Sequence, residues 1–580
     1  MNNFLGSFNY FLFIQNFFKT RKIYLIFVLY LIGTLMEMIN IGLIIPFLNL
    51  MFNESPINIF PFNFEFFKFE NHFLNLNIKY LLIILIILLF IIKSIILVIV
   101  ARLQSLFFAE MRTRISTYFF NLYLSKSYLF FLEEKSSSKI IRNITMLSSS
   151  YSGFLERFLL LANDFFIFLG VIIVLFIYNP AISSTVFICL ISFSFLFSNF
   201  TKKYFFNLGK NLLSLSSDII KDIQESLDNI LQIKLLKKTS YFQKRFNYKV
   251  RDNSYKVAQL TFLQSLPKIF IEMISILLLF TIIFFLIYFD KPQQEILSLL
   301  TLFAIAIMRI IPVSNKLISF LNSFSSFVPS LELLSNEIKL SINTQNENES
   351  SQSEIKNLPL VNLIEVENLS FRYDEREKII FKNINFNLKK NNIYGLAGET
   401  GSGKTTLLNI ISGLIKPEKG SIKYDGFDVN KVNKNISYVS QNTYLLNTSI
   451  KMNICFGCEP DEINENKLNN CIKLSKLDKM IKNLPKGLET NISELGSNFS
   501  GGQIQRLSIA RALYSNSNFI IFDEPTSSLD ENISNEILKM ISSLRENKII
   551  LIISHTKKDL KICDVIFKIE DNNLLKIDDI

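Results

Sequence analysis

The run Ile393-Tyr-Gly-Leu-Ala-Gly398-Glu-Thr-Gly401-Ser-Gly403-Lys404-Thr405-Thr406 joins an apolar, strand-like segment to a glycine-rich loop. The loop fits the pattern G-x-x-x-x-G-K-[ST], whose glycines let backbone N–H groups turn inward around phosphate oxygens. A helix that starts near Lys404 adds the positive end of its dipole. Lys404 is expected to reach the β- and γ-phosphates of a nucleotide, and the Thr405 hydroxyl to hold Mg²⁺. The pattern predicts a nucleotide site formed by Gly398, Glu399, Thr400, Gly401, Ser402, Gly403, Lys404, Thr405 and Thr406.

A second segment, FIIFDE, carries two acidic residues directly after four apolar ones. The apolar residues are typical of a buried parallel strand, and such sheets place ligands at the carboxyl ends of their strands. Asp523 is expected to bind Mg²⁺ and Glu524 to polarise an attacking water. An apolar run followed by an acid is common at strand ends, so this motif gains its meaning from the phosphate loop beside it.

Between these motifs lies Asn498-Phe-Ser500-Gly501-Gly502-Gln503-Ile-Gln-Arg506, which resembles the LSGGQ signature of ATP-binding cassette (ABC) proteins. Phe499 stands where leucine is usual, an apolar exchange. The resemblance implies that Ser500, Gly501, Gly502 and Gln503 grip the γ-phosphate of an ATP held by another cassette.

The remaining cassette motifs can be placed on this sequence by the same resemblance. It implies that Tyr373 stacks on adenine, that Gln441 in YVSQN senses Mg²⁺, and that His555 is the switch histidine that contacts the γ-phosphate. It also places the D-loop at Ser527-Ser528-Leu529-Asp530. Glu494 and Gly496 match a segment that touches the membrane domain, although Ser493 replaces the usual glycine.

Composition separates the chain into two unlike parts. The 580 residues carry a net charge of +11, and 49% are hydrophobic, which excludes a disordered chain; five cysteines exclude a disulfide scaffold. Residues 1–344 hold 31 Lys/Arg against 19 Asp/Glu, a net +12, whereas 345–580 hold 30 against 31, a net −1. The basic excess therefore flanks apolar runs, which indicates a membrane and not a nucleic acid as the partner.

The apolar runs match the roughly 20 residues that a helix needs to cross a bilayer. We expect six spans, at about 23–48, 79–101, 158–178, 181–200, 267–289 and 294–313. Only Asn179-Pro180 separates the third from the fourth, which predicts a tight helical hairpin.

Basic residues are concentrated in two long loops, 102–157 and 201–256, and before the first span. The positive-inside rule then places both termini in the cytoplasm of a multi-pass protein. Each loop has about 50 residues rich in helix formers, so we expect the membrane helices to continue into the cytoplasm and reverse there. The N-terminal stretch FLGSFNYFLFIQNFFKT lacks the features of a cleavable signal; it predicts either an amphipathic surface helix or the start of the first span.

The order of parts resembles an ABC exporter half-transporter. This predicts an α-helical transmembrane domain with six spans at 1–340, a polar linker at 341–360, and an α/β P-loop nucleotide-binding domain at 361–580. The stretches SYLFFLEEKSSSKIIRNIT and IQESLDNILQIKLL resemble the two cytoplasmic coupling regions. Because one cassette supplies one phosphate loop and one signature, the resemblance implies a homodimer that encloses two ATP molecules.

Charged residues inside the spans indicate the substrate. Intramembrane charges are costly and usually functional, although snorkelling or pairing between helices also explains them. The acids are Glu37, Asp164 and Glu272, and the cations are Lys93, Lys268 and Arg309. In a dimer, the cations would place six positive groups around one cavity, which suits a pyrophosphate or another phosphorylated headgroup.

Three membrane segments, GTLMEMINIGLIIPF, SLPKIFIE and AIMRIIPVSNKL, resemble the PglK-type flippases of bacterial protein N-glycosylation. The resemblance implies ATP-driven translocation of a polyprenyl-pyrophosphate-linked oligosaccharide across the bacterial inner membrane. Two alternatives stay open: an exporter of another substrate, such as lipid A core, a peptide or drugs, and a cassette protein that does not transport. The six spans oppose a DNA-repair cassette, and the intact Lys404, Asp523, Glu524 and His555 oppose an inactive regulator.

Overall fold

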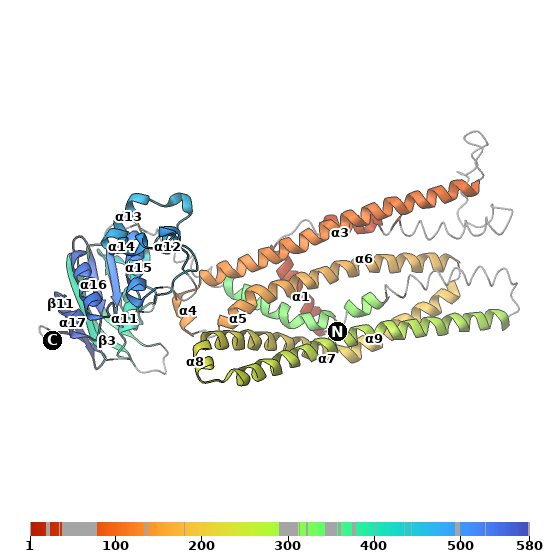
Figure 1. Cartoon of the computed structure of the whole chain (residues 1–580). Coiled ribbons are helices and arrows are strands. Elements are labelled where there is room, and N and C mark those ends of the chain that lie inside the picture. The colour runs from red at the N-terminus through yellow and green to blue at the C-terminus, as the bar shows by residue number, and fades with distance from the viewer. Residues whose placement is uncertain are drawn as a thin grey trace. The chain divides into compact units, whose positions relative to one another are not determined.

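The computed structural model describes residues 2–18, 24–33, 35–36, 78–133, 137–178, 180–288, 311, 314–320, 323–342, 356–357, 361–373, 379–399, 401–433, 435–441, 443–492, 499–527 and 529–577. The chain forms two compact units, shown in Figure 1. The first comprises Met1–Lys126 and Glu134–Gln345, and the second comprises Ser127–Glu133 and Asn346–Ile580. The finer boundaries at 340 and 360 stay predictions.

Long helices build the first unit: α3 (Ile78–Leu124), α6 (Ser148–Tyr178), α7 (Pro180–Asp228) and α9 (Thr239–Tyr288) (Figure 1). With 47 residues, α3 is about 70 Å long at about 1.5 Å per residue, against about 30 Å of hydrocarbon. The apolar runs are thus continued by polar helix, as predicted. Pro180 opens α7, where its missing N–H costs no helical bond.

Membrane-crossing character is found in part of this unit. Among the described residues, three helices are long and apolar enough to cross a membrane, Ile86–Leu124, Thr239–Phe285 and Ser314–Ile342, and Tyr24–Gly33 is a shorter apolar helix. The first predicted span is described only at its start, and the sixth, 294–313, lies outside the described residues except for 311.

The N-terminal stretch is helical, as both alternatives require. Helix α1 (Asn2–Phe18) buries Phe11 and Ile14. The Phe11 ring lies 5.2 Å from the ring of Phe154 and 5.0 Å from that of Phe158, both on α6. Aromatic contacts of this kind fix α1 to the bundle.

Ion pairs between side chains join the C-terminal part of α7 to the N-terminal part of α9. The buried carboxylate of Asp222 accepts hydrogen bonds from Arg245 at 2.6 Å and Lys249 at 2.7 Å, and Glu225 accepts one from Arg245 at 2.8 Å. A buried acid with two cationic partners is compensated for its desolvation. The network therefore holds the two helices side by side next to the short helix α8 (Ile230–Leu235), which connects them and lies in the predicted second coupling region.

The predicted first coupling region is divided between the two units. Helix α4 (Tyr128–Glu133) belongs to the second unit, where Leu129 packs against the buried core of the cassette. Helix α5 (Ser137–Arg142) and a π-helical turn (Asn143–Leu147) lie in the first unit and lead into α6.

The second unit contains a six-stranded sheet with the order β12-β11-β4-β10-β9-β8. All neighbours are parallel except β11 and β12. The central strand β10 is buried along its whole length, as expected for a parallel strand covered on both faces. The strands are β4 (Asn392–Gly398), β8 (Ile436–Val439), β9 (Phe519–Asp523), β10 (Ile549–Ile553), β11 (Val565–Glu570) and β12 (Asn573–Ile577).

A four-stranded antiparallel sheet with the order β3-β2-β5-β6 and a short parallel pair, β1-β7, complete the strands. Their bounds are β1 (Lys356–Asn357), β2 (Leu363–Phe371), β3 (Phe381–Lys389), β5 (Lys419–Tyr424), β6 (Phe427–Asp428) and β7 (Val432–Asn433). The helices of this unit are α11 (Lys404–Ile411), α12 (Ile450–Ile454), α13 (Glu465–Leu474), α14 (Asp478–Lys482), α15 (Gly501–Tyr514), α16 (Glu531–Ser543) and α17 (Lys557–Leu560).

Strand register positions the functional motifs. Ile553 of β10 pairs with Leu396 of β4 on one side and with Asp523 of β9 on the other. The three parallel strands therefore end within two residues of one level. The segments that follow them, which begin at Glu399, Glu524 and Ser554, leave the sheet together at one edge.

One glycine of the membrane unit marks a close helix contact. A Cβ at Gly209 of α7 would lie 2.1 Å from the backbone oxygen of Ser326. We expect Gly209→Ala to force the two helices apart and to destabilise the protein by at least about 1–3 kcal/mol. The thermal unfolding midpoint of the purified full chain in detergent measures this loss.

The matched control is Gly153→Ala in α6, where an added Cβ meets nothing within 4 Å. There the exchange relieves the helix penalty of glycine, about 1 kcal/mol. Equal midpoints for the two variants would contradict the close contact at Gly209.

Candidate functional site: a nucleotide site at the sheet edge

The phosphate loop joins β4 to α11. Gly401 and Gly403 have φ angles of 87° and 101°, in the left-handed region that favours glycine. A Cβ at Gly403 would also lie 2.8 Å from Cγ2 of Ile380. The turn thus requires glycine for conformation and for space. Thr400 lies outside the described residues.

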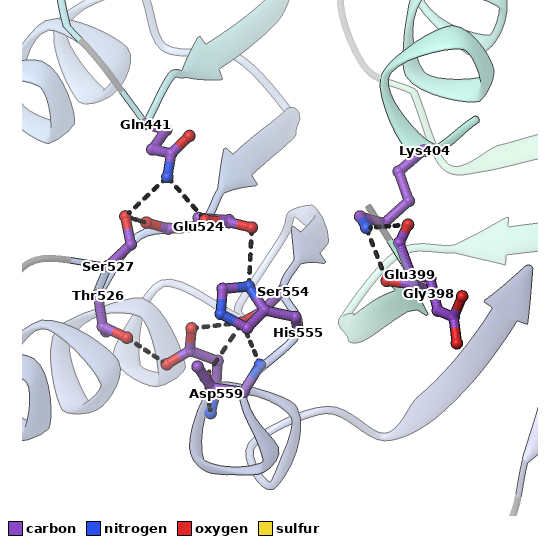
Figure 2. Close-up of polar contacts among 11 residues, drawn as sticks. Gly398, Glu399, Lys404, Gln441, Glu524, Thr526, Ser527, Ser554, His555 and Asp559 are labelled. Carbon is purple, nitrogen blue, oxygen red and sulfur yellow. Dashed lines mark hydrogen bonds and ion pairs between the residues drawn. The ribbon is translucent and has the colours of Figure 1, made fainter. Parts of the chain in front are cut away.

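The lysine of the loop folds back on it. Lys404 Nζ donates hydrogen bonds to the carbonyl oxygens of Gly398 at 2.7 Å and Glu399 at 3.0 Å (Figure 2). These bonds hold the ammonium group at the start of α11, beside the helix N-terminus. A positive charge at this point suits a β- or γ-phosphate.

Hydroxyl groups of the loop fit a phosphate ligand and Mg²⁺. The hydroxyl of Ser402 is buried, and the described residues offer it no hydrogen-bond partner. Thr405 is exposed at the loop surface. In the described part of the chain, no three His, Cys, Asp or Glu residues are grouped to hold a metal. Mg²⁺ suits such a site, because it is usually bound by one or two protein oxygens together with substrate phosphates.

Tyr373 lies next to the phosphate-loop helix. Its hydroxyl is 3.1 Å from Oγ1 of Thr406, and its ring packs edge-on against Phe371 at 5.1 Å. The ring stays partly exposed, which leaves a face for an adenine base.

Asp523 ends β9 and faces a tyrosine that the sequence motifs did not single out. The hydroxyl of Tyr438 donates to Asp523 Oδ2 at 2.7 Å. Burial and the nearby Glu524 charge raise the pKa of Asp523, whereas the Tyr438 bond and Lys404 lower it. Burial also raises the pKa of Tyr438, so its phenol stays a donor. Tyr438 thus contacts the carboxylate that the sequence predicts to bind Mg²⁺, and its position three residues before Gln441 was the signal available in the sequence.

Three residues predicted from the sequence meet at the Glu524 carboxylate: Glu524 itself, Gln441 and His555. Gln441 Nε2 donates to Glu524 Oε2 at 2.7 Å, and His555 Nδ1 lies 2.9 Å from Glu524 Oε1 (Figure 2). Glu524 has a φ of 47°, an unfavourable value for a residue with a Cβ. Its N–H donates to Ile553 O at 2.8 Å and its carbonyl accepts from Ser527 N at 3.2 Å. The fold thus fixes a strained backbone where the carboxylate is needed.

The signature segment lies at the start of α15. Ser500 and Gln503 form a capping box, with Ser500 N donating to Gln503 Oε1 at 2.9 Å. Gly501 is exposed, and Gly502 is buried against Ile533. Among the described residues, no hydrogen bond links these four residues to the phosphate loop. Glu494, Gly496 and Ser528 lie outside the described residues.

The predicted substrate cations occupy different surroundings. Lys93 of α3 is buried, with its ammonium 5.7 Å from the Phe90 ring centre, whereas Lys268 of α9 is exposed in the chain by itself. Arg309 lies outside the described residues. Of the acids, Asp164 is buried and lies 3.1 Å from Lys316.

Comparisons with known proteins agree with this geometry. Residues 381–527 match the ABC transporter family, and residues 23–310 match the ABC transporter transmembrane region. An "ATP-dependent lipid A-core flippase" of Vibrio cholerae is 25% identical over 80% of this chain and 79% of its own length. A "Probable ABC transporter ATP-binding/permease protein" of Haemophilus influenzae is 35% identical, over 37% of this chain and 39% of that protein.

The fold agrees with that of a solved transporter. The structure of a bacterial Atm1-family ABC exporter with ATP bound superposes with a TM-score of 0.75, at 18% identity, over 96% of this chain and 94% of that one. This likeness confirms the predicted fold class, an exporter-type transmembrane domain followed by an α/β nucleotide-binding domain. The chain belongs to the ABC transporter family and is an exporter-type half-transporter, an integral membrane protein with one ATPase cassette.

Proposed function

We propose that this half-transporter uses ATP to flip a polyprenyl-pyrophosphate-linked oligosaccharide across the bacterial inner membrane. The observation that carries the substrate class is a buried cation, Lys93, in the apolar part of α3. Charged side chains in the apolar part of a membrane helix are costly and usually functional. A diphosphate headgroup is an anion that such a cation can bind, and the relatives named as lipid A-core flippases support a lipid substrate.

A second candidate substrate is lipid A core. It is favoured by the 25% identity to the lipid A-core flippase of Vibrio cholerae, which extends over most of both chains. Lipid A core and the proposed oligosaccharide lipid each have a hydrocarbon tail, acyl in the first and prenyl in the second, and a phosphorylated headgroup. The PglK-like segments around Lys268 and Arg309 favour the oligosaccharide lipid.

For ATP hydrolysis we assign Glu524 as the group that polarises the attacking water. Gln441 and His555 both contact its carboxylate, so they fix its orientation. His555 also has an exposed ring that can reach a γ-phosphate. A carboxylate held in this way acts as a general base without having to reorganise during the reaction.

The nucleotide would be held by the residues that surround this carboxylate. Lys404 and the glycines of the loop contact the phosphates, Tyr373 stacks on adenine, and Ser500–Gln503 of a partner chain close the site. Mg²⁺, when bound, neutralises phosphate charge, and Thr405, Gln441 and Asp523 are the residues that would hold it.

We further propose a homodimer with two composite ATP sites. The signature lies at a helix start with exposed Ser500 and Gly501, ready to face another chain. At the second coupling region, Leu231 and Leu235 of α8 are each 68% exposed, which is a large apolar surface for a cytoplasmic turn. From the clustered Lys and Arg of 102–157 and 201–256 we infer that these regions and both termini are cytoplasmic.

Replacing the proposed general base tests the chemistry. Glu524→Gln keeps the shape but removes the negative charge, so ATP turnover should fall at least about 100-fold. The variant should retain unhydrolysed ATP, measured as bound nucleotide after gel filtration. The control is Glu531→Gln, which changes an exposed glutamate of α16 and should keep wild-type turnover. Unchanged ATPase in Glu524→Gln would refute the assignment.

Two complementary defects test the composite sites. Homodimers of Lys404→Ala and homodimers of Gly501→Asp should both be inactive, because every site then contains one defect. Co-expressed chains form mixed dimers with one intact site, so random pairing should restore about one quarter of the wild-type ATPase. Gly501 is exposed, and an added Cβ there would lie 3.7 Å from Cδ2 of Leu529, an ordinary van der Waals contact. Absence of recovery would contradict pairing between chains.

Removing the intramembrane cations tests the substrate. Lys93→Ala, Lys268→Ala and Arg309→Ala together should abolish flipping of a lipid-linked oligosaccharide in proteoliposomes while basal ATPase persists. A triple variant of exposed cytoplasmic lysines, at 203, 210 and 244, is the control and should flip normally. Oligosaccharide flipping that survives in the first variant would refute the cation site. Wild-type protein that moves lipid A core but no oligosaccharide lipid would establish the second candidate.

A further inference from the structure

A buried carboxylate outside the known cassette motifs connects the two segments that carry Glu524 and His555. Asp559, in the short helix α17, is 1% exposed. Its Oδ1 accepts a hydrogen bond from Thr526 Oγ1 at 2.6 Å, and its Oδ2 accepts one from Ser554 Oγ at 2.7 Å (Figure 2). Hydroxyl bonds to an ionised carboxylate are short and strong, as both of these are.

We propose that Asp559 is a positioning residue for ATP hydrolysis, which holds the Glu524 and His555 segments in register through Thr526 and Ser554. The proposal rests on the hydrolytic roles proposed above for Glu524 and His555. Asp559 acts indirectly: among the described residues, its carboxylate accepts hydrogen bonds from these two hydroxyl groups and from neither catalytic side chain.

The two segments need a connection beyond the sheet. The β9–β10 ladder ends with the pair Asp523 and Ile553, and one more backbone bond follows, from Glu524 N to Ile553 O at 2.8 Å. Thr526 then lies two residues past Glu524, and Ser554 directly precedes His555. The carboxylate of Asp559 therefore bridges the two segments at the point where the β9–β10 backbone pairing has ended.

The bridge bears on the strained residue. Glu524 keeps its φ of 47° only if its surroundings hold the turn in place. The turn is closed by Ser527, whose N–H and hydroxyl both donate to Glu524 O, at 3.2 and 3.0 Å. Thr526 lies within this turn, and Asp559 links it to Ser554, which follows strand β10.

The bridge also bears on the switch histidine. The His555 side chain is 61% exposed, so few contacts of its own hold the ring. Its backbone is held instead by Ser554, which is buried and whose hydroxyl also accepts from Thr556 N at 3.0 Å. Because the Ser554 hydroxyl donates its hydrogen bond to Asp559, its lone pairs face the Thr556 N–H, from which it accepts.

Helix capping does not account for Asp559. Thr556 is the N-cap of α17, and its side chain accepts from the Asp559 N–H. The Asp559 carboxylate is thus directed to other segments of the chain. Thr556 therefore caps the helix, while the Asp559 carboxylate links two segments outside it, which an acid that only stabilises a helix start would not do.

The test compares steady-state ATPase of full-length variants in lipid nanodiscs. Asp559→Ala should lower kcat about tenfold to 100-fold, as small misplacements of catalytic groups do, with the KM for ATP changed less than about twofold. Binding of a fluorescent ATP analogue should be equally unaffected. Asp559→Asn, which can accept from one hydroxyl and donate to the other, should recover most of kcat.

The double variants separate positioning from folding. Thr526→Val and Ser554→Ala should each lower kcat, and adding either to Asp559→Ala should cause no further loss, because all three changes break one bridge. If Asp559→Ala does not fold, the two hydroxyl variants alone and together decide the same question. Asp564→Asn is the matched control: this carboxylate accepts from Ile393 N at 2.8 Å and Arg545 at 2.7 Å, away from the hydrolytic residues.

Several outcomes would overturn the bridge. The first two are a wild-type kcat in Asp559→Ala and a loss of kcat no larger than that of Asp564→Asn. The others are a parallel loss of ATP binding in Asp559→Ala and losses of kcat that multiply in the double variants. Glu524→Gln, measured in parallel, tells the two proposals apart. Normal turnover in that variant refutes the hydrolytic assignment, whereas its inactivity beside a fully active Asp559→Ala refutes the bridge only.

Discussion

Parallel hydrogen bonding between β4, β10 and β9 is the constraint on which the nucleotide site depends. The ladder sets Leu396, Ile553 and Asp523 at one level, so three segments distant in sequence leave the sheet at the same edge. Each strand is apolar because both faces are covered, and each ends where a polar side chain can turn outward. A slip of one residue in any strand would turn that side chain to the opposite face of the sheet.

The site at this edge is organised around a carboxylate. Glu524 sits in a left-handed turn, and Gln441 and His555 approach its two oxygens. Behind them, Tyr438 contacts Asp523 and Asp559 spans the two strand ends. Such supporting contacts keep reacting groups within the narrow range of geometry that catalysis needs. The proposed catalytic residues are therefore part of a wider polar network in the cassette.

The membrane unit obeys a different constraint. Its helices satisfy their own backbone groups, as a bilayer demands, and continue far beyond the apolar zone. The extensions are then held by side chains: the Asp222 ion network joins α7 to α9, and Gly209 lets α7 approach the helix around Ser326. Helix α4, although it follows α3 in the chain, belongs to the second unit, where Leu129 packs against the cassette core.

Local patterns in the sequence determined the long helices, the phosphate loop, the acidic strand end at Asp523 and the ABC exporter fold class. Each of these depends on residues close together in the chain, whose period, glycine content or charge carries the signal. Only the tertiary structure decided that Gln441 and His555 meet at Glu524, that Tyr438 backs Asp523, and that Asp559 bridges Thr526 and Ser554. Those contacts join residues up to 85 positions apart, and their geometry follows from strand order and register, which a single segment of sequence does not encode.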